Sequence, residues 1–144
     1  MPLLGKGVAA IWHNVAPDIQ PDYNHWHCSE HMLERVGIEG FLRGRRYDAI
    51  NGKPKFFHFY ETTTPCLSSA ASDVYKRQEK AMREKPDEVT DWIIFIEAIN
   101  DKTLLRIWDK KYASEKALIE NGAHSANIGT YKLHYSLSSE DLIE

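Results

Sequence analysis

Residues 21–36 read PDYNHWHCSEHMLERV, and they predict one helix between two strands, from which the rest of the fold follows. Pro21 suits a first helical turn, where the missing N–H of proline costs little, and Gly37 is a typical helix stop. At about 100° per residue, an apolar stripe runs along one side of this helix: Trp26, Met32, Leu33 and Val36. We expect the stripe to pack on a sheet, with His27 and His31 on an exposed helix face or at the rim of a cleft.

Strands are expected on both sides of this helix. Residues 7–13 read GVAAIWH and alternate between two faces. After the helix come residues 40–50, GFLRGRRYDAI, and the aromatic-rich residues 55–62, KFFHFYET. Asn51-Gly52 between them is a strong hairpin signal. The order strand, helix, strand, strand is most of a ferredoxin-like βαββαβ unit.

The second half of the chain predicts two strands, a helix and a last strand. These are DWIIFIEAI (91–99), TLLRIWD (103–109), SEKALIEN (114–121) and TYKLHYSL (130–137). Ser114 is a candidate N-cap of the helix and Gly122 its stop. In the last strand one face should carry Tyr131, Leu133, Tyr135 and Leu137. Earlier, EKAMREK (79–85) is a polar helical piece.

Residues 68–78, SSAASDVYKRQ, look foreign to the rest of the chain. They resemble the in-frame translation of a transposon-type sequencing adapter of the kind found in metagenomic assemblies. On this interpretation residues 79–144 come from another reading frame or gene; the alternative is an ordinary Ser/Ala-rich linker. We therefore expect a βαββ half over 1–66, a linker and helix over 67–86, and a ββαβ half over 87–144 that packs with the first as one domain.

Composition narrows the classes of function. The 144 residues suit one globular domain, and a formal net charge of -3 gives no basic field for nucleic acid. No apolar run approaches the roughly 20 residues of a membrane span. Two cysteines make no disulfide framework, and the N-terminus is a poor signal peptide. We expect a cytoplasmic protein without a membrane or nucleic-acid partner.

The pattern His27-x-x-Glu30-His31 has the letters of a helical zinc-protease motif. Residues four apart on a helix share a face, and Glu30 could polarise a bound water. Such a site still needs a third protein ligand, and no other histidine stands at a paired spacing. We therefore expect no metal, and keep a small His27/His31 metalloenzyme as an alternative.

The block DYNHWHCSEHMLERVGIEGFLRGRRY (22–47) resembles the EthD-like and related dimeric α+β barrel families. These proteins carry an aromatic residue early in the first helix, a Trp…His pair, a Gly-Phe or Gly-Leu turn, and a strand that ends in Arg-Tyr. The matching positions here are Trp26, Glu30, His31, Gly40, Phe41, Arg46 and Tyr47. The resemblance extends over residues 7–62.

The chain departs from the family pattern at three points. Glu39 stands where the family usually has a proline before the glycine, and Leu33 lies where a proline often follows the histidine. The spacing from Trp26 to His31 is five rather than four. Residues 92–137 more loosely resemble the back half of a barrel of the antibiotic-biosynthesis-monooxygenase type.

The resemblance implies an α+β fold: a ferredoxin-like antiparallel sheet with helices on one face, paired in a homodimer as a dimeric α+β barrel. It also implies a cavity between sheet and helices for a small aromatic or polyketide-like ligand. The chemistry in such families is cofactor-independent oxidation, isomerisation, cyclisation or decarboxylation. Some relatives bind haem, but no residue here is a secure haem ligand, and we expect no cofactor.

His31 is the best candidate for a catalytic acid or base, because an unperturbed pKa of about 6.5 allows proton exchange near neutral pH. A flat pocket for an aromatic ligand could be formed by Trp12, Trp26, His27, Tyr47 and His58. Core packing is the other interpretation of these aromatic residues. Arg43 and Arg45 share a strand face with Tyr47 and could bind an anionic group, or could simply be solvated.

Three hypotheses follow from the sequence. The first is a small cofactor-independent enzyme with His31 as its acid or base. The second is a non-catalytic ligand-binding or structural barrel. The third is the His27/His31 metalloenzyme.

Overall fold

The computed structural model describes residues 2–67, 92–108 and 114–143, which group into two compact units. One unit contains residues 2–67 together with 129–143, and the other contains residues 92–108 and 114–128. The possible adapter at 68–78 and the helix expected at 79–85 lie outside the described residues. No helix in these ranges is long and apolar enough to cross a membrane.

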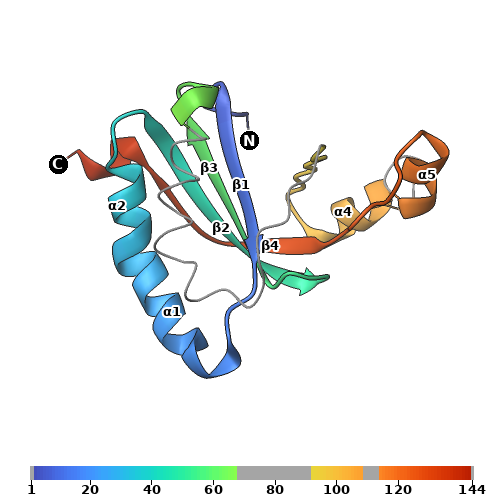
Figure 1. Cartoon of the computed structure of the whole chain (residues 1–144), viewed down its shortest axis with the longest axis horizontal. Helices are drawn as coiled ribbons and strands as arrows, with labels where there is room; N and C mark the ends of the chain where they lie inside the picture. Colours follow the sequence, from blue (N-terminus) through green and yellow to red (C-terminus); the bar gives the residue numbers. More distant parts are fainter. Residues whose placement is uncertain (1, 68–91, 109–113, 144) are drawn as a thin grey trace. The chain divides into compact units, whose positions relative to one another are not determined.

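The larger unit is built on a four-stranded antiparallel sheet (Figure 1). Its strands are β1 (Gly7–His13), β2 (Phe41–Asn51), β3 (Phe56–Thr62) and β4 (Thr130–Ser138). They lie in the order β1-β3-β2-β4, so β1 and β2 run parallel with β3 antiparallel between them. This confirms the α+β, ferredoxin-like class and the four strands expected at these positions.

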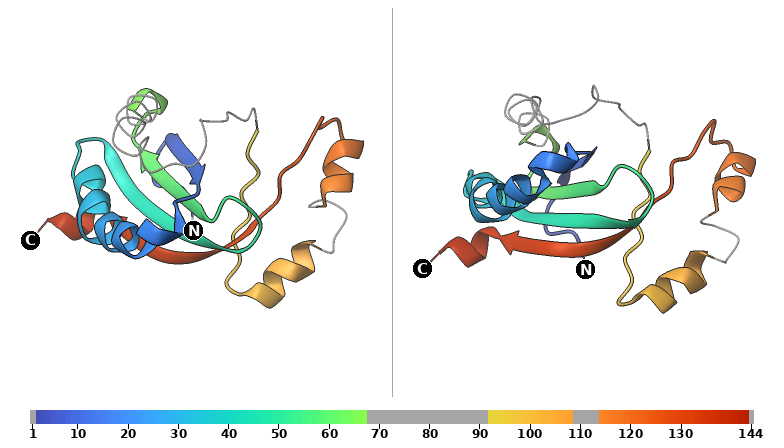
Figure 2. Two further views of the ribbon diagram at one scale, coloured as in Figure 1. Left: turned by 60° about the horizontal axis from the view of Figure 1, so that its bottom comes forward. Right: turned by 90° about the horizontal axis from the view of Figure 1, so that it is seen from below.

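The predicted helix runs along one face of this sheet, as Figures 1 and 2 show. It follows the short 3-10 turn η1 (Pro17–Ile19) and consists of α1 (Gln20–Trp26), the π-helical turn η2 (His27–His31) and α2 (Met32–Val36). It ends at Gly37, as predicted. A core cluster of side chains from α2 and all four strands joins helix to sheet: Ala9, Met32, Val36, Phe41, Tyr60 and Leu137.

The π-helical turn corrects the expected position of the two histidines. A π-turn closes with i→i+5 bonds and holds more residues per turn than an α-helix. The residues after it are therefore displaced around the helix from where a regular 100° step would put them. His27 and His31 are both fully buried, and Leu33 from the expected apolar stripe is exposed instead. The expected exposed histidine pair was wrong for this reason.

Strand β4 carries a second irregularity of the same kind. Its register against β2 shifts between Arg46 and Tyr47, which face Tyr135 and Leu133. A bulge of this sort reverses which face the following side chains point to. Tyr135 and Leu137 consequently pack with the helix-side core, while Tyr131 packs on the other face with Phe57. The prediction that the four apolar residues of this strand share one face was wrong.

The smaller unit contains helices α4 (Asp101–Trp108) and α5 (Glu115–Glu120). Helix α5 was predicted: the Ser114 side chain accepts a hydrogen bond from Ala117 N, and Gly122, with φ +102°, follows its end. Two other predictions fail. The stretch 103–109 is helical up to Trp108 rather than a strand, and residues 92–98 of the strand expected at 91–99 have no regular secondary structure.

Gly44 on β2 lies directly beneath the helix. A Cβ there would collide with Met32 Sδ and lie 3.1 Å from Tyr60 Cε1 and 3.2 Å from Val36 Cγ2. We expect Gly44→Ala to lower the free energy of unfolding by about 1–3 kcal/mol, since overpacking forces neighbouring side chains off their rotamers. Chemical denaturation followed by circular dichroism measures the loss. Gly44→Ala with wild-type stability would show that the helix is packed more loosely than the structure has it.

Candidate active site between the helix and the sheet

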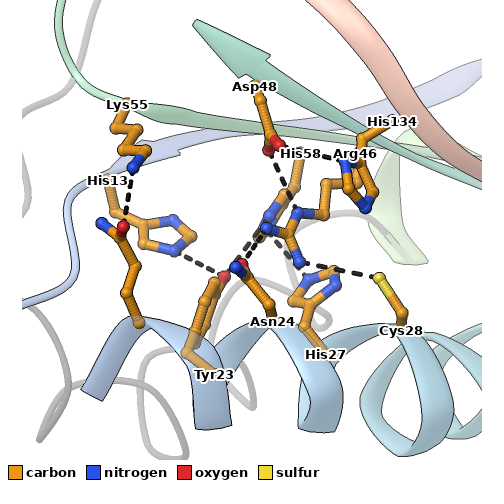
Figure 3. Close-up of polar contacts among 11 residues, drawn as sticks. His13, Tyr23, Asn24, His27, Cys28, Arg46, Asp48, Lys55, His58 and His134 are labelled. Carbon is orange, nitrogen blue, oxygen red and sulfur yellow. Dashed lines mark hydrogen bonds and ion pairs between the residues drawn. The ribbon is translucent and has the colours of Figure 1, made fainter. Parts of the chain in front are cut away.

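Three histidines and a tyrosine form a hydrogen-bonded chain between the helix and the sheet (Figure 3). The hydroxyl of Tyr23 on α1 lies 2.7 Å from Nε2 of His13 on β1 and 3.4 Å from Nε2 of His58 on β3. Nδ1 of His58 lies 3.2 Å from Nε2 of His27. The chain His13–Tyr23–His58–His27 thus crosses from the β1 edge of the sheet to the π-turn, and we call it the His-Tyr chain.

The rings of the His-Tyr chain pack directly on one another. The centroids of His27 and His58 are 4.0 Å apart, and those of His13 and His58 are 4.8 Å apart. All four side chains are buried. His31 lies beside them, with its ring 5.2 Å from that of His27 and 4.5 Å from that of Trp26. The group is therefore a cluster of four imidazoles shielded from water.

Burial keeps His27, His31 and His58 neutral. Loss of hydration lowers the pKa of His27 and of His58 well below the usual value, and the nearby histidines and Arg46 lower both further. Burial, with a smaller contribution from Arg35, lowers the pKa of His31 to about 3. The usual pKa of about 6.5, on which the sequence argument for His31 rested, therefore does not hold in the folded chain.

Arg46 on β2 places one positive charge against this cluster. Its guanidinium donates to Asn24 Oδ1, to Asp48 Oδ1 at 3.4 Å and to Cys28 Sγ at 3.6 Å. The same group lies over the ring of Phe56, 4.8 Å from its centroid. These contacts hold the guanidinium in one place between the helix and the sheet.

The polar network reaches the surface at β4. The second carboxylate oxygen of Asp48 lies 3.0 Å from Nδ1 of His134, and both side chains are partly exposed. His134, Asp48 and Arg46 therefore form a line from solvent to the buried imidazoles (Figure 3).

The structure brings together four of the predicted site residues and separates the other two. His27, His31, His58 and Trp26 lie in one cluster under the helix. Trp12 and Tyr47 lie on the opposite face of the sheet. There they pack on Phe57, with ring centroids 4.3 Å and 5.3 Å from it. The six residues therefore do not line one pocket.

Arg43 and Arg45 are neither solvated nor directed at a ligand. Both are buried and bind the fully buried carboxylate of Glu61, whose Oε1 is 2.7 Å from Nη2 of each. Its other oxygen accepts from Leu4 N at 2.7 Å. The anion that these arginines bind is thus part of the chain itself.

The described residues contain no group of three or more His, Cys, Asp and Glu side chains placed to hold a metal ion. His27 and His31 do lie close together, but they contact their neighbours in the cluster through a hydrogen bond and through ring packing. Cys28 and Cys66 form no disulfide.

Sequence reasoning missed much of the polar network: His13, Tyr23, Asn24, Arg46, Asp48 and His134. The alternation of side chains along the strands could have identified two of the histidines. His13 shares a face with Ala9 and Ile11, which pack under the helix, and His58 shares a face with Tyr60. When histidines on two neighbouring strands point to the same buried face of the sheet, we expect their side chains to lie close together.

Comparison of the chain with protein-family models, with curated proteins and with solved structures finds no match.

Proposed function

We propose that this chain is a small enzyme that moves protons on a small organic molecule, with a neutral histidine of the His-Tyr chain as its base. The observation that supports this proposal is the buried hydrogen-bonded sequence His13–Tyr23–His58–His27. The reaction class is proton abstraction next to a carbonyl group and its return at the same or another atom, which is an isomerisation.

The His-Tyr chain can carry a proton because each member both donates and accepts. A neutral imidazole has one N–H and one lone pair, and a phenol hydroxyl has both functions. In one arrangement each residue donates a hydrogen bond to the next, from His13 through Tyr23 and His58 to His27. In the reverse arrangement every bond is donated in the opposite direction, starting from His27. In the reverse sense the lone pair of His27 lies on Nδ1, which is buried and has no hydrogen-bond partner among the described residues. That atom is the proposed proton acceptor.

The electrostatics suit a reaction that creates negative charge. The imidazoles are neutral at pH 7 and can accept a proton, although their low pKa makes them weak bases towards a neutral substrate. An enolate formed next to the new imidazolium would offset this weakness, because opposite charges attract strongly away from water. The fixed guanidinium of Arg46 adds a second positive charge on the same side.

His31 remains the alternative base at the same site. Its ring lies between Trp26 and His27, so a flat substrate that contacts one of the two histidines is close to the other. The family resemblance of residues 7–62 supports an aromatic or polyketide-like substrate and a homodimer. Two cysteines that form no disulfide support a reducing, cytoplasmic setting.

Exchange of C–H protons for deuterium in a panel of aromatic ketones and β-dicarbonyl compounds tests the proposal by NMR. We expect His27→Gln to lower the exchange rate by about 10²–10⁴-fold, the usual contribution of a positioned acid or base. Tyr23→Phe should reduce it less, because the His58–His27 pair remains. His31→Gln identifies the base: a loss as large as that of His27→Gln would assign the role to His31.

His124→Gln is the matched control, since His124 is exposed and lies in the smaller unit. Each variant must retain the wild-type circular dichroism spectrum. If the folded wild-type chain exchanges no substrate faster than imidazole in solution does, or if His27→Gln and His31→Gln both match His124→Gln, the chain is a ligand-binding or structural protein instead.

A further inference from the structure

Arg45 and Arg46 are neighbouring buried arginines on β2, but the chain offsets their charges differently. Neither side chain is exposed to solvent. Nη2 of Arg45 lies 2.7 Å from Oε1 of Glu61, which is itself fully buried. Among the described residues Arg46 has one carboxylate partner, Asp48, whose Oδ1 lies 3.4 Å from Nε. Bonds between a guanidinium and a carboxylate are usually about 2.7–2.9 Å long. The positive charge of Arg46 is therefore only partly offset by this part of the chain.

The guanidinium of Arg46 also has N–H groups without a partner in the described residues. Its three nitrogens make one hydrogen bond each: Nη2 donates to Oδ1 of Asn24, Nε to Asp48 and Nη1 to Sγ of Cys28 at 3.6 Å. Each Nη carries a second N–H group. The thiol of Cys28 is only a weak acceptor. A buried positive charge with weak partners is costly, and an anion that accepts from it removes much of that cost.

Asp48 can release Arg46 without losing its own partner. Its second oxygen, Oδ2, lies 3.0 Å from Nδ1 of His134 on β4, closer than its first oxygen lies to Arg46. Both side chains are partly exposed, so water also solvates this carboxylate. A ligand carboxylate could therefore replace Asp48 at Arg46 while Asp48 stays bonded to His134. A carboxylate and a guanidinium often bind through two parallel bonds, which are stronger than the single long contact between Asp48 and Arg46.

The partners of Arg46 separate its guanidinium from solvent by a single layer of side chains. Asn24 is exposed, Cys28 is partly exposed, and 33 % of the Asp48 side chain is exposed. Asn24 and Cys28 come from the helix, and Asp48 comes from the sheet (Figure 3). A small ligand thus reaches Arg46 by rotation of these side chains, and neither the helix nor the sheet has to open.

Arg46 also lies beside the proposed base. Figure 3 shows its guanidinium next to the rings of His27 and His58. Burial lowers the pKa of both histidines, and the charge of Arg46 lowers them further, so both are neutral. The guanidinium also lies 5.4 Å from the ring centroid of Tyr23 and 4.8 Å from that of Phe56. These rings exclude water, which strengthens the attraction between Arg46 and an anion.

We propose that Arg46 binds the carboxylate group of a small organic acid, and that Asp48 occupies this place when no ligand is bound. Because the bound group lies beside His27 and His58, the substrate of the proposed reaction is then a keto acid. Its carboxylate contacts Arg46 and its carbonyl group faces the imidazoles. The assignment of the substrate rests on the proposed function, whereas carboxylate binding by Arg46 does not.

NMR titration of the isotope-labelled full chain with matched acids and amides tests the inference. Acetate and acetamide are similar in shape, as are phenylacetate and phenylacetamide, and only the acids carry a charge. We expect at least one acid to bind at least about tenfold more tightly than its amide, since hydrogen bonds to charged groups are the stronger ones. The amide signals that shift should include those of Asn24, Cys28 and Asp48.

Three variants assign the binding to Arg46. Arg46→Met should remove the preference for the acid, because methionine fills much of the same space without a charge. Arg106→Met is the matched control and should bind as the wild type does, since Arg106 is exposed and lies in the smaller unit. Asp48→Asn should bind the acid about two- to fivefold more tightly, because a competing negative charge is gone. Asp48 is partly exposed, so this variant should fold even if Arg46→Met does not.

The inference is overturned if neither acid binds more tightly than its amide, if Arg46→Met binds the acid as Arg106→Met does, or if Asp48→Asn fails to tighten binding. None of these outcomes touches the proposed reaction on neutral ketones, for which His27→Gln is the test. A chain that binds the acids through Arg46 but exchanges no C–H proton is instead a carboxylate-binding protein without the proposed activity.

Discussion

Lowering the pH from 7 to between about 5 and 4 is expected to unfold the larger unit. Three buried histidines are neutral in the folded chain and bind protons once the chain unfolds, so acid favours the unfolded state. His27, His31 and His58 have pKa values below the usual one in the folded chain, and that of His31 is about 3. In the unfolded chain each should titrate near 6.5. Below pH 6.5 the unfolded state therefore binds more protons than the folded state, and stability falls as pH falls.

The expected effect is large because the three groups act together. Each contributes a loss of up to about 1.4 kcal/mol per pH unit below its unfolded pKa, so three contribute about 4 kcal/mol per unit. The loss between pH 7 and 5 is then about 6 kcal/mol, which is comparable with the whole stability of many domains. Above about pH 6.5 the stabilisation is fully present. For His31 the loss stops near pH 3, where the folded form also becomes protonated.

Urea denaturation at a series of pH values, followed by far-UV circular dichroism, measures this dependence. The slope of unfolding free energy against pH should correspond to about three protons near pH 5. His31→Gln should reduce the slope by about one proton, whereas His25→Gln, a change at an exposed helix position, should leave it unchanged. A slope below one proton in the wild type would mean that the buried imidazoles are protonated in the folded chain.

Glu61→Ala is expected to lower the free energy of unfolding by about 3–5 kcal/mol, the usual result of removing one member of a buried ion pair. Its carboxylate accepts from Arg43 Nε at 3.0 Å and from one Nη2 of each arginine at 2.7 Å. Arg45 is fully buried and also lies 4.8 Å from the centroid of the Phe59 ring. Without Glu61 these guanidinium groups lose the carboxylate that offsets their desolvation.

Thermal and urea denaturation at pH 7 measure the loss. Glu61→Gln should lose less than Glu61→Ala, since the amide oxygen still accepts one or two of these bonds while the charge is gone. Glu34→Ala on the exposed side of α2 is the control and should change stability by less than about 0.5 kcal/mol. Equal stability of Glu61→Ala and Glu34→Ala would contradict the buried position of this carboxylate.

The fold of residues 7–62 could be predicted because its local signals agree with one another. Alternation over 7–13, the aromatic-rich run 55–62, the Asn51-Gly52 hairpin and the helix stop at Gly37 all indicate the same arrangement, and the structure has it. The Ser114 cap and the strand at 130–137 were predictable for the same reason.

Two predictions failed where one pattern allows two structures. An apolar run such as 91–99 is typical of a buried strand, but the same letters also suit an irregular segment, and residues 92–98 have no regular secondary structure. The stretch 103–109 combines residues that suit either a helix or a strand, and it forms part of α4. Nothing in the local sequence separates these possibilities, because packing between distant parts of the chain decides between them.

Only part of the candidate site could be predicted from the sequence. The histidine-rich stretch indicated His27 and His31. Periodicity placed them on the wrong side of the helix, because a helical wheel assumes 100° per residue and cannot represent a π-turn. Assembling the His-Tyr chain needs the relative positions of β1, β3 and α1. Those positions depend on packing between residues as far apart in the sequence as His13 and His58.

The π-turn also decides which changes of length this helix tolerates. A π-turn holds one residue more than an α-helical turn for the same rotation, so deletion of one codon within 27–31 would give an ordinary helix in which the later residues keep their orientation. Met32 and Val36 would then stay in the core. Insertion of one further codon would instead turn every later helical residue by about 100° and move both side chains out of the core. Related chains should therefore be one residue shorter between Tyr23 and Val36 more often than one residue longer.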